Sequence, residues 1–284
     1  MILIADSGST KTEWREISEG KAGRSYESSG FSPFFLKSKD IFSFLRKEMA
    51  EVANLPVDQI HFYGTGCSTP SKQAIIRNAL KKFFVTAELF IDSDLLGAAR
   101  SLCMNEAGIA CIVGTGSNSC YYDGTKIVSN VAPLGYILGD EGSGAVIGRK
   151  LVAGVLKKQL PQSVIDEFFK SYPYTPATIL ENVYNMPFPN KFLGQFVKFI
   201  DENIDIPELK WIVVSSFDEF IIRNVLQYPE ASKLPVHFTG RIAFHFRPIL
   251  EDLLIKHDLK PGKFSHSPMD DLVNYHIQNL MKHP

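Results

Sequence analysis

Apolar and polar positions divide the first third of the chain into short strands and amphipathic helices. Residues 1–27 consist of β-rich runs separated by small-residue turns, which predicts strands joined by hairpins. Apolar side chains recur at helical spacing in residues 39–54 and again in residues 71–84. Short β-rich runs at 59–63 and 87–91 predict further strands. This alternation is typical of an α/β domain with a largely parallel sheet.

The predicted strands end at residues suited to binding a ligand. Right-handed crossovers would bring Asp6, Gly64 and Asp92 to one edge of the sheet, where open α/β sheets bind their ligands. Residues 28–35, which include Phe31, Phe34 and Phe35, are expected either to pack on the core or to form a ligand wall.

The first of these strand ends runs into a turn of small residues. Backbone N–H groups and hydroxyls of Ser7, Gly8, Ser9 and Thr10 could approach an anion, Lys11 adds a cation, and Asp6 could hold a hydrated Mg²⁺. Taken alone, these residues are better explained by an ordinary hairpin turn with a solvated lysine, and the phosphate-binding interpretation depends on the motifs that follow.

A second candidate carboxylate is Asp94, at the start of a helix predicted from residue 95. It is either a helix cap or a base that accepts the proton of a hydroxyl attacking phosphorus. We name Asp94 as the candidate base.

The strand–turn–strand pattern of the first residues recurs at residues 108–128. Gly114 and Gly116 free the backbone of the turn, while Thr115 and Ser117 supply hydrogen-bond donors. Two similar turns predict two related halves that close on one polyphosphate. Neither turn has the spacing of a Walker loop or of a dinucleotide-binding motif.

Glycines crowd around two adjacent acids at residues 134–144. Asp140 and Glu141 could receive the hydroxyls of a sugar, or the segment could only cap the helix predicted from residue 145. Beyond it we predict helices at 163–172, 176–186, 192–203, 212–226, 244–257 and 267–281, and a strand at 236–238.

Composition restricts the class of partner. The 284 residues carry a formal net charge of −1, with 45% hydrophobic and 21% charged residues, which favours neither nucleic acid nor an anionic membrane as partner. No apolar run approaches the ~18 residues of a membrane span. The four cysteines lack zinc-site spacing and are expected to be buried thiols in a reducing compartment. We therefore expect a cytoplasmic protein.

Four motifs in this order together resemble the N-acetylglucosamine kinase branch of the BadF/BadG/BcrA/BcrD ATPase family, within the actin and sugar kinase superfamily. They are Asp-Ser-Gly-Ser-Thr-Lys-Thr at 6–12, Asp94 with Gly97, Gly-Thr-Gly-Ser-Asn at 114–118 and Gly-Asp-Glu-Gly-Ser at 139–143. The likeness is close over residues 1–158. It implies an α/β, two-domain actin-like ATPase (ribonuclease H-like) fold, each half a mixed sheet flanked by helices. The domains would be 1–105 and 106–267, with a last helix, 268–284, on the first.

The resemblance implies an ATP-dependent kinase of an amino sugar, with Asp94 as base and Mg²⁺ held by Asp6 through water. It implies roles in ATP binding for two groups of residues. Phosphate-binding residues would be Ser7, Gly8, Ser9, Thr10, Lys11, Thr12, Gly114, Thr115, Gly116 and Ser117; adenosine-binding residues would be Gly240 and Arg241. By composition alone Gly240 and Arg241 are a strand-to-helix turn. The substrate-binding residues would be Asp94, Asn118, Leu134, Gly135, Asp140 and Glu141. A homodimer is compatible with the family.

Two positions depart from the family pattern. The family's asparagine in the early loop falls at Pro33, and its tryptophan falls at Leu134, so the particular sugar stays open. Two other functions remain alternatives: an ATPase that activates another enzyme through a cysteine-bound iron–sulfur cluster, and a non-catalytic amino-sugar sensor.

Overall fold

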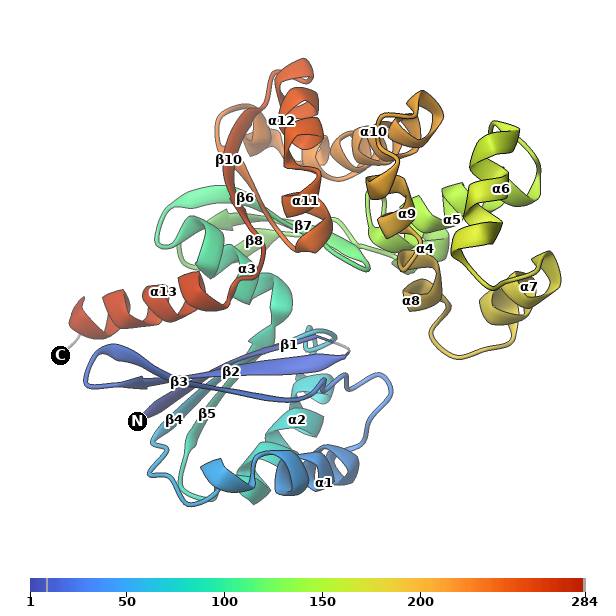
Figure 1. The fold of residues 1–284 in the computed structure, drawn as a ribbon. Coiled ribbons are helices and arrows are strands. Elements are labelled where there is room, and N and C mark those ends of the chain that lie inside the picture. The colour runs from blue at the N-terminus through green and yellow to red at the C-terminus, as the bar shows by residue number, and fades with distance from the viewer. Residues whose placement is uncertain (9, 283–284) are drawn as a thin grey trace. The chain divides into compact units, whose positions relative to one another are not determined.

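The computed structural model describes residues 1–8 and 10–282, and within them the chain forms two five-stranded sheets with helices packed on them (Figure 1). These residues belong to two compact units. Unit 1 comprises residues 1–107, 122–128 and the segment from Ser267 onward, and unit 2 comprises residues 108–121 and 129–266. Among the helices of the described chain, none combines the length and the apolar character needed to cross a membrane.

The first sheet has the strand order β3-β2-β1-β4-β5. Its strands are β1 (Ile2–Ser7), β2 (Lys11–Ser18), β3 (Lys21–Ser29), β4 (Gln59–Gly64) and β5 (Glu88–Ser93). β1 pairs with β2 antiparallel and with β4 parallel, and β4 pairs with β5 parallel. The hairpin-linked start and the parallel strands that followed from the sequence are thereby confirmed.

Helices cover both faces of this sheet (Figure 1). They are α1 (Ser38–Glu48), followed by the 3-10 turn η1 (Ala50–Val52), α2 (Pro70–Phe83), α3 (Asp94–Cys103) and α13 (Met269–Lys282). Leu3 and Ala5 point into a core with α1 and α2, whereas Ile4 between them packs against Leu272 and Val273 of α13. Because successive side chains of a strand alternate in direction, one strand serves both cores.

The second sheet has the order β10-β9-β6-β7-β8. Its strands are β6 (Ala107–Val113), β7 (Ser117–Asp123), β8 (Ile127–Ser129), β9 (Pro235–Thr239) and β10 (Lys260–Ser265). Read from its other edge, the order 8-7-6-9-10 corresponds strand by strand to 3-2-1-4-5 of the first sheet. This is the repeat of two related halves that the two small-residue turns predicted.

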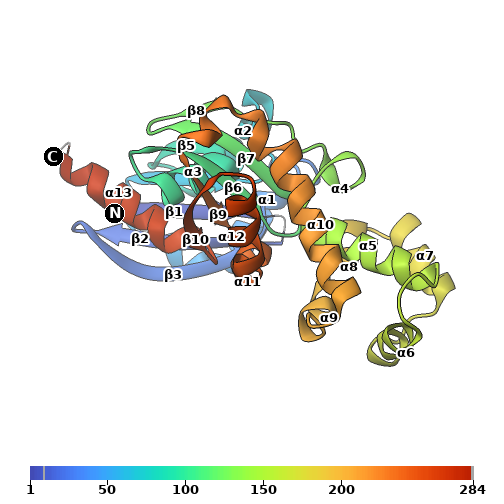
Figure 2. The ribbon, with the colours of Figure 1, turned by 90° about the horizontal axis from the view of Figure 1, so that it is seen from above.

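Unit 2 contains most of the helices. They are α4 (Gly135–Leu138), α5 (Gly144–Leu156), α6 (Gln162–Ser171), α7 (Pro176–Tyr184), α8 (Pro189–Gly194), α9 (Val197–Glu202), α10 (Pro207–Arg223), α11 (Arg241–His245) and α12 (Arg247–Lys256), with the 3-10 turns η2 (Val225–Gln227) and η3 (Pro229–Ser232). Their apolar faces share one core with the strands β6 and β9. In both views α6 and α7 lie at the end of unit 2 remote from the second sheet (Figures 1 and 2).

Several predicted boundaries were wrong. The helix predicted at 192–203 is two short helices, α8 and α9, and the helix predicted at 212–226 is α10, which begins at Pro207. The helix predicted at 244–257 is divided into α11 and α12 just before Pro248, whose ring cannot donate the helical hydrogen bond. Strand β10 was not predicted, since Pro261 and Gly262 lower its β propensity and only an edge position tolerates them.

Candidate active site

The parallel strands of unit 1 bring their carboxyl ends to one edge of the first sheet. Asp6 is aligned with Tyr63 and Tyr63 with Asp92, while Gly64 is aligned with Ser7. The predicted placement of Asp6, Gly64 and Asp92 on one edge is therefore confirmed. A carboxylate that follows β5 directly, such as Asp94, lies at this same edge.

Asp94 is the first residue of α3, but it is not the helix cap. The cap is Ser93, whose hydroxyl accepts a hydrogen bond from the N–H of Leu96 at 3.2 Å. One oxygen of Asp94 instead accepts from the N–H of Leu95 at 2.9 Å, and the hydroxyl of Thr65 also bonds the carboxylate. Burial raises the pKa of Asp94, and these hydrogen bonds oppose that rise. The side chain is thus an oriented carboxylate with increased basicity.

Asp6 carries an unusual charge environment. Its pKa is raised to about 7, first by burial and then by the charges of Asp94 and Glu13, and Lys11 only partly offsets these effects. The ammonium of Lys11 is itself paired with Glu27 at 2.9 Å. Concentrated negative charge of this kind fits a bound cation. Residues 1–8 and 10–282 hold no cluster of three metal-ligating side chains.

The first small-residue turn, between β1 and β2, has a buried side and an exposed side. Ser7 and Thr12 are buried, their hydroxyls are 2.7 Å apart, and the hydroxyl of Ser7 accepts from the N–H of Phe31 at 3.0 Å. These hydroxyls hold the turn to the following loop. Gly8, Thr10 and Lys11 are exposed, so this side of the turn is the part accessible to an anion, although the N–H of Gly8 donates to the carbonyl of Lys11 at 3.0 Å. Ser9 lies outside the described residues.

The three phenylalanines of the loop after β3 do not all pack on the core. Phe31 is fully buried in the core of unit 1, whereas Phe34 and Phe35 are exposed by 63% and 70%. Lys72 lies 4.6 Å from the centroid of the Phe34 ring and donates to the carbonyl of Pro33 at 3.0 Å. Only the first of the three therefore packs into the core.

The second small-residue turn, between β6 and β7, is attached to the N-terminus of α5. The N–H of Gly144 donates to the carbonyl of Gly114 at 2.8 Å, and the N–H of Ala145 donates to that of Thr115 at 3.1 Å. The side chain of Thr115 stays exposed. These first N–H groups of α5 are bonded to the turn itself, so the helix contributes the positive end of its dipole there and no free donor from Gly144 or Ala145.

Asp140 lies against this second turn. The N–H of Ser117 donates to its carboxylate, and burial together with the charge of Glu141 raises the pKa of Asp140 to about 6 in spite of that bond. Asp140 has φ +52°, and Leu134 and Gly135 also have positive φ. Leu134 is exposed by 61% although it is apolar. Strained backbone and an exposed apolar side chain beside an oriented carboxylate are characteristic of binding sites.

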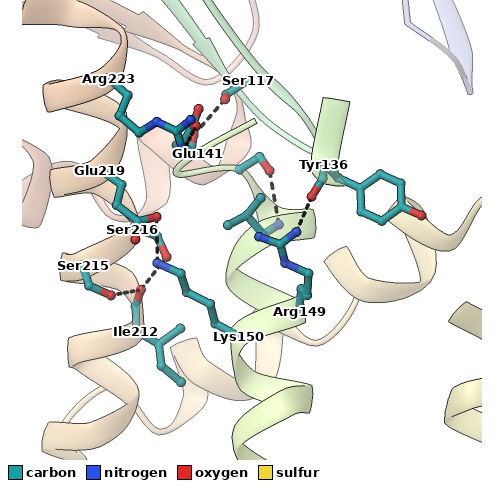
Figure 3. Close-up of polar contacts among 12 residues, drawn as sticks. Ser117, Tyr136, Glu141, Arg149, Lys150, Ile212, Ser215, Ser216, Glu219 and Arg223 are labelled. Carbon is teal, nitrogen blue, oxygen red and sulfur yellow. Dashed lines mark hydrogen bonds and ion pairs between the residues drawn. The ribbon is translucent and has the colours of Figure 1, made fainter. Parts of the chain in front are cut away.

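Glu141 differs from its neighbour because its carboxylate is bound within the protein (Figure 3). Arg223 forms an ion pair with it at 2.7 Å, and Asn224 donates to its second oxygen at 3.2 Å. Both partners come from the end of α10. The side chain of Glu141 is only 9% exposed.

Asn118 is also held by a neighbour. Its side-chain oxygen accepts from the N–H of Ser119 and from the amide of Asn130, each at 2.9 Å. The oxygen of Asn118 is thus used within the protein, and its amide nitrogen is the group that could donate to a ligand.

The predicted adenosine motif lies beside a cavity. Gly240 has φ +111°, and a Cβ there would meet the carbonyl oxygen of Val113 at 2.5 Å, so only glycine fits. The cavity is about 430 Å³ in volume and lies wholly within unit 2; its wall includes Gly194, Lys198, Asp201, Arg241, His245 and His266. Arg241 lines this cavity, whose size is in the range of a small-molecule site.

Three residues with evident roles were missed from the sequence. Thr65 was seen only as part of a glycine turn, although its position at the end of a strand was a usable signal. Arg223 and Asn224 gave no local signal, because only the packing of α10 brings them to Glu141.

Comparisons with known proteins agree with this architecture. The chain is 45% identical to a protein from Porphyromonas gingivalis, provisionally named N-acetylglucosamine kinase, over 99% of this chain and 100% of that one, with a TM-score of 0.94. A protein of the same provisional name from Chromobacterium violaceum is 17% identical over 96% and 98%, with a TM-score of 0.69. The ROK hexokinase from Thermus thermophilus is 11% identical over 100% and 99%, with a TM-score of 0.55. No protein-family model and no curated protein matches the chain.

The two sheets of matching strand order, with small-residue turns and carboxylates at their strand ends, define an actin-like ATPase fold of the sugar kinase type. Within this class the likeness to the Porphyromonas protein extends over the whole chain. The chain belongs to the family of that protein, which carries the provisional name N-acetylglucosamine kinase.

Proposed function

We propose that this protein is an ATP-dependent kinase that phosphorylates a hydroxyl of an N-acetylhexosamine, N-acetylglucosamine first among them. The observation that carries the proposal is the environment of Asp94. Its carboxylate is oriented by Leu95 and Thr65, is not needed as a helix cap, and has its pKa raised by burial. A base requires both a fixed position and increased basicity.

In the proposed mechanism Asp94 orients the acceptor hydroxyl and takes its proton as the oxygen attacks phosphorus. The phosphorus–oxygen bond to ADP breaks as the new one forms, so catalysis is mostly positioning and charge compensation. Mg²⁺, when bound, would supply positive charge near the phosphates, and Asp6 would hold it through water. The raised pKa of Asp6 supports a cation at this position.

Both small-residue turns would bind ATP phosphates through the backbone and exposed groups of residues 7–12 and 114–117. The hydroxyls of Ser7 and Thr12 are already bonded inside unit 1, which favours backbone contacts there. Gly240 and Arg241 would bind the adenosine in the adjoining cavity, since glycine allows close approach and a guanidinium stacks on an aromatic base. On the sugar side, Asp140 would accept from hydroxyls and Asn118 would donate. Leu134 and Gly135 would complete that surface.

The kinase proposal is favoured over an iron–sulfur activator by the state of the cysteines. All four are buried, whereas an activator of that kind would need cysteines at a dimer surface to hold its cluster. A non-catalytic sensor is less well supported, because such a protein has no use for an oriented carboxylate of raised pKa at Asp94.

The experiment is ADP release by the purified protein with ATP and Mg²⁺. The sugars are N-acetylglucosamine, glucosamine, N-acetylmannosamine, N-acetylmuramic acid and glucose, each with a sugar-free control. Stimulation by an N-acetylated sugar, with a phosphosugar detected by mass spectrometry, is the expected result. ATP binding without stimulation by any sugar would contradict the proposal.

A further inference from the structure

The turn that carries Asp140 is fastened to the far end of helix α10 through one buried carboxylate. Both oxygens of Glu141 have partners: Arg223 contacts one at 2.7 Å (Figure 3), and Asn224 donates to the other at 3.2 Å. With 9% of its side chain exposed, Glu141 has little surface to offer a sugar. Its interactions are made within the protein.

The backbone of Glu141 is fixed from the opposite side by strand β7. The hydroxyl of Ser117 donates to the carbonyl of Glu141 at 2.8 Å, and the N–H of Ser117 donates to the carboxylate of Asp140. One residue of β7 therefore bonds both members of the acidic pair. The orientation of Asp140 and the position of Glu141 depend on the same short segment.

Helix α10 also packs directly beneath the turn. A Cβ at Gly142 would lie 3.1 Å from atoms of both Phe217 and Phe220, so the turn lies close against the helix. Asp140 and Gly142 have φ of +52° and +72°. Such a conformation is maintained only where its surroundings determine it. Here the surroundings are α10 and the ion pair at its end.

We propose that Arg223 and Asn224 are positioning residues for sugar binding: they hold Glu141, and Glu141 holds Asp140 in the orientation that receives a sugar hydroxyl. The effect on sugar binding rests on the proposed kinase function. The coupling of Arg223 to Asp140 does not, because all the residues involved belong to unit 2. It separates the two adjacent acids, with Asp140 facing the ligand and Glu141 acting through the protein.

The kinetic test compares Arg223→Gln, Arg223→Lys and Glu141→Gln with the natural chain. Lys150→Gln is the matched control, since Lys150 pairs with Glu219 of α10 at 3.0 Å, one helical turn before Arg223 (Figure 3). We expect Arg223→Gln and Glu141→Gln to raise the sugar KM by about tenfold, with kcat and ATP KM changed less than about threefold. Arg223→Lys should recover part of the affinity, and Lys150→Gln should change no constant by more than about twofold.

A second readout needs no activity. The amide of Ser117 reports its hydrogen bond to Asp140, so its ¹⁵N–¹H resonance should shift in Arg223→Gln in the same direction as in Asp140→Asn, and should stay in place in Lys150→Gln. If the resonance moves while the natural chain phosphorylates no sugar, the coupling stands and the kinase proposal fails. An unmoved Ser117 amide, or equal effects of Arg223→Gln and Lys150→Gln, overturns the inference. Circular dichroism shows whether each variant is folded. If Arg223→Gln is unfolded, the same measurements on Arg223→Lys test the inference.

Discussion

The carboxylate of Asp94 acts on that of Asp6: burial first, and then the charges of Asp94 and Glu13, raise the pKa of Asp6 to about 7. The two residues come from different strand ends, β1 and β5, separated in the sheet by β4. A base and a cation-binding group, the roles proposed for Asp94 and Asp6, are what phosphoryl transfer to a hydroxyl requires. Each can be tested separately.

Asp94→Asn should lower kcat by on the order of 10²-fold or more, because the amide cannot accept the proton of the attacking hydroxyl. ATP affinity, measured by calorimetry, should be nearly unchanged. Asp92→Asn is the matched control, since Asp92 lies in β5 two residues before Asp94, which begins α3. Near-normal turnover of Asp94→Asn would remove the catalytic role.

Asp6→Asn should raise the Mg²⁺ concentration needed for half-maximal rate by about tenfold or more, because the amide attracts a hydrated cation far less than a carboxylate does. Chelation of Mg²⁺ should stop turnover of the natural chain. Glu88→Gln, an exposed change at the opposite end of β5, should leave the Mg²⁺ dependence as it is. An unchanged requirement in Asp6→Asn would mean that the metal is held elsewhere.

Asp140 should make the protein less stable as the pH rises. Its pKa is raised from 3.8 to about 6 in the folded state, so the folded chain binds this proton more tightly than the unfolded chain. The contribution is full below about pH 4 and is lost as the pH rises through about 6; it amounts to at most about 3 kcal/mol before solvent screening. Urea unfolding at several pH values should show a smaller decline in Asp140→Asn. The raised pKa would be contradicted if the stability of Asp140→Asn declined with pH as steeply as that of the natural chain or of the exposed control Asp166→Asn.

A pair of glycine substitutions separates the sugar side of the second turn from its phosphate side. A Cβ at Gly116 would lie 3.0 Å from an oxygen of Asp140, whereas one at Gly114 would meet nothing within 4 Å. Gly116→Ala should therefore displace the Asp140 carboxylate and raise the sugar KM by about fivefold. Gly114→Ala should change the sugar KM by less than about twofold. Equal sugar KM values for the two variants would argue against Asp140 as the sugar ligand.

The local chemistry of the chain was readable from the sequence. Strand ends at Asp6 and Gly64, small residues at 114–117 and the acidic pair Asp140 and Glu141 all follow from short-range patterns of side-chain type. The repeated strand–turn–strand pattern even predicted two related halves, as the matching strand orders show. Boundaries were less predictable where helices break, as before Pro248, and where an edge strand contains Pro261.

The sequence by itself determined which residue types stand at the strand ends, because that depends on neighbours along the chain. The tertiary structure decided how each is used. Only packing shows that Ser93, not Asp94, caps α3, that the hydroxyls of Ser7 and Thr12 are bonded inside unit 1, and that Arg223 reaches Glu141. Glu141 and Arg223 are 82 residues apart in the sequence. No local pattern records such a pair, because its energy arises from burial of one charge beside another after the chain has folded.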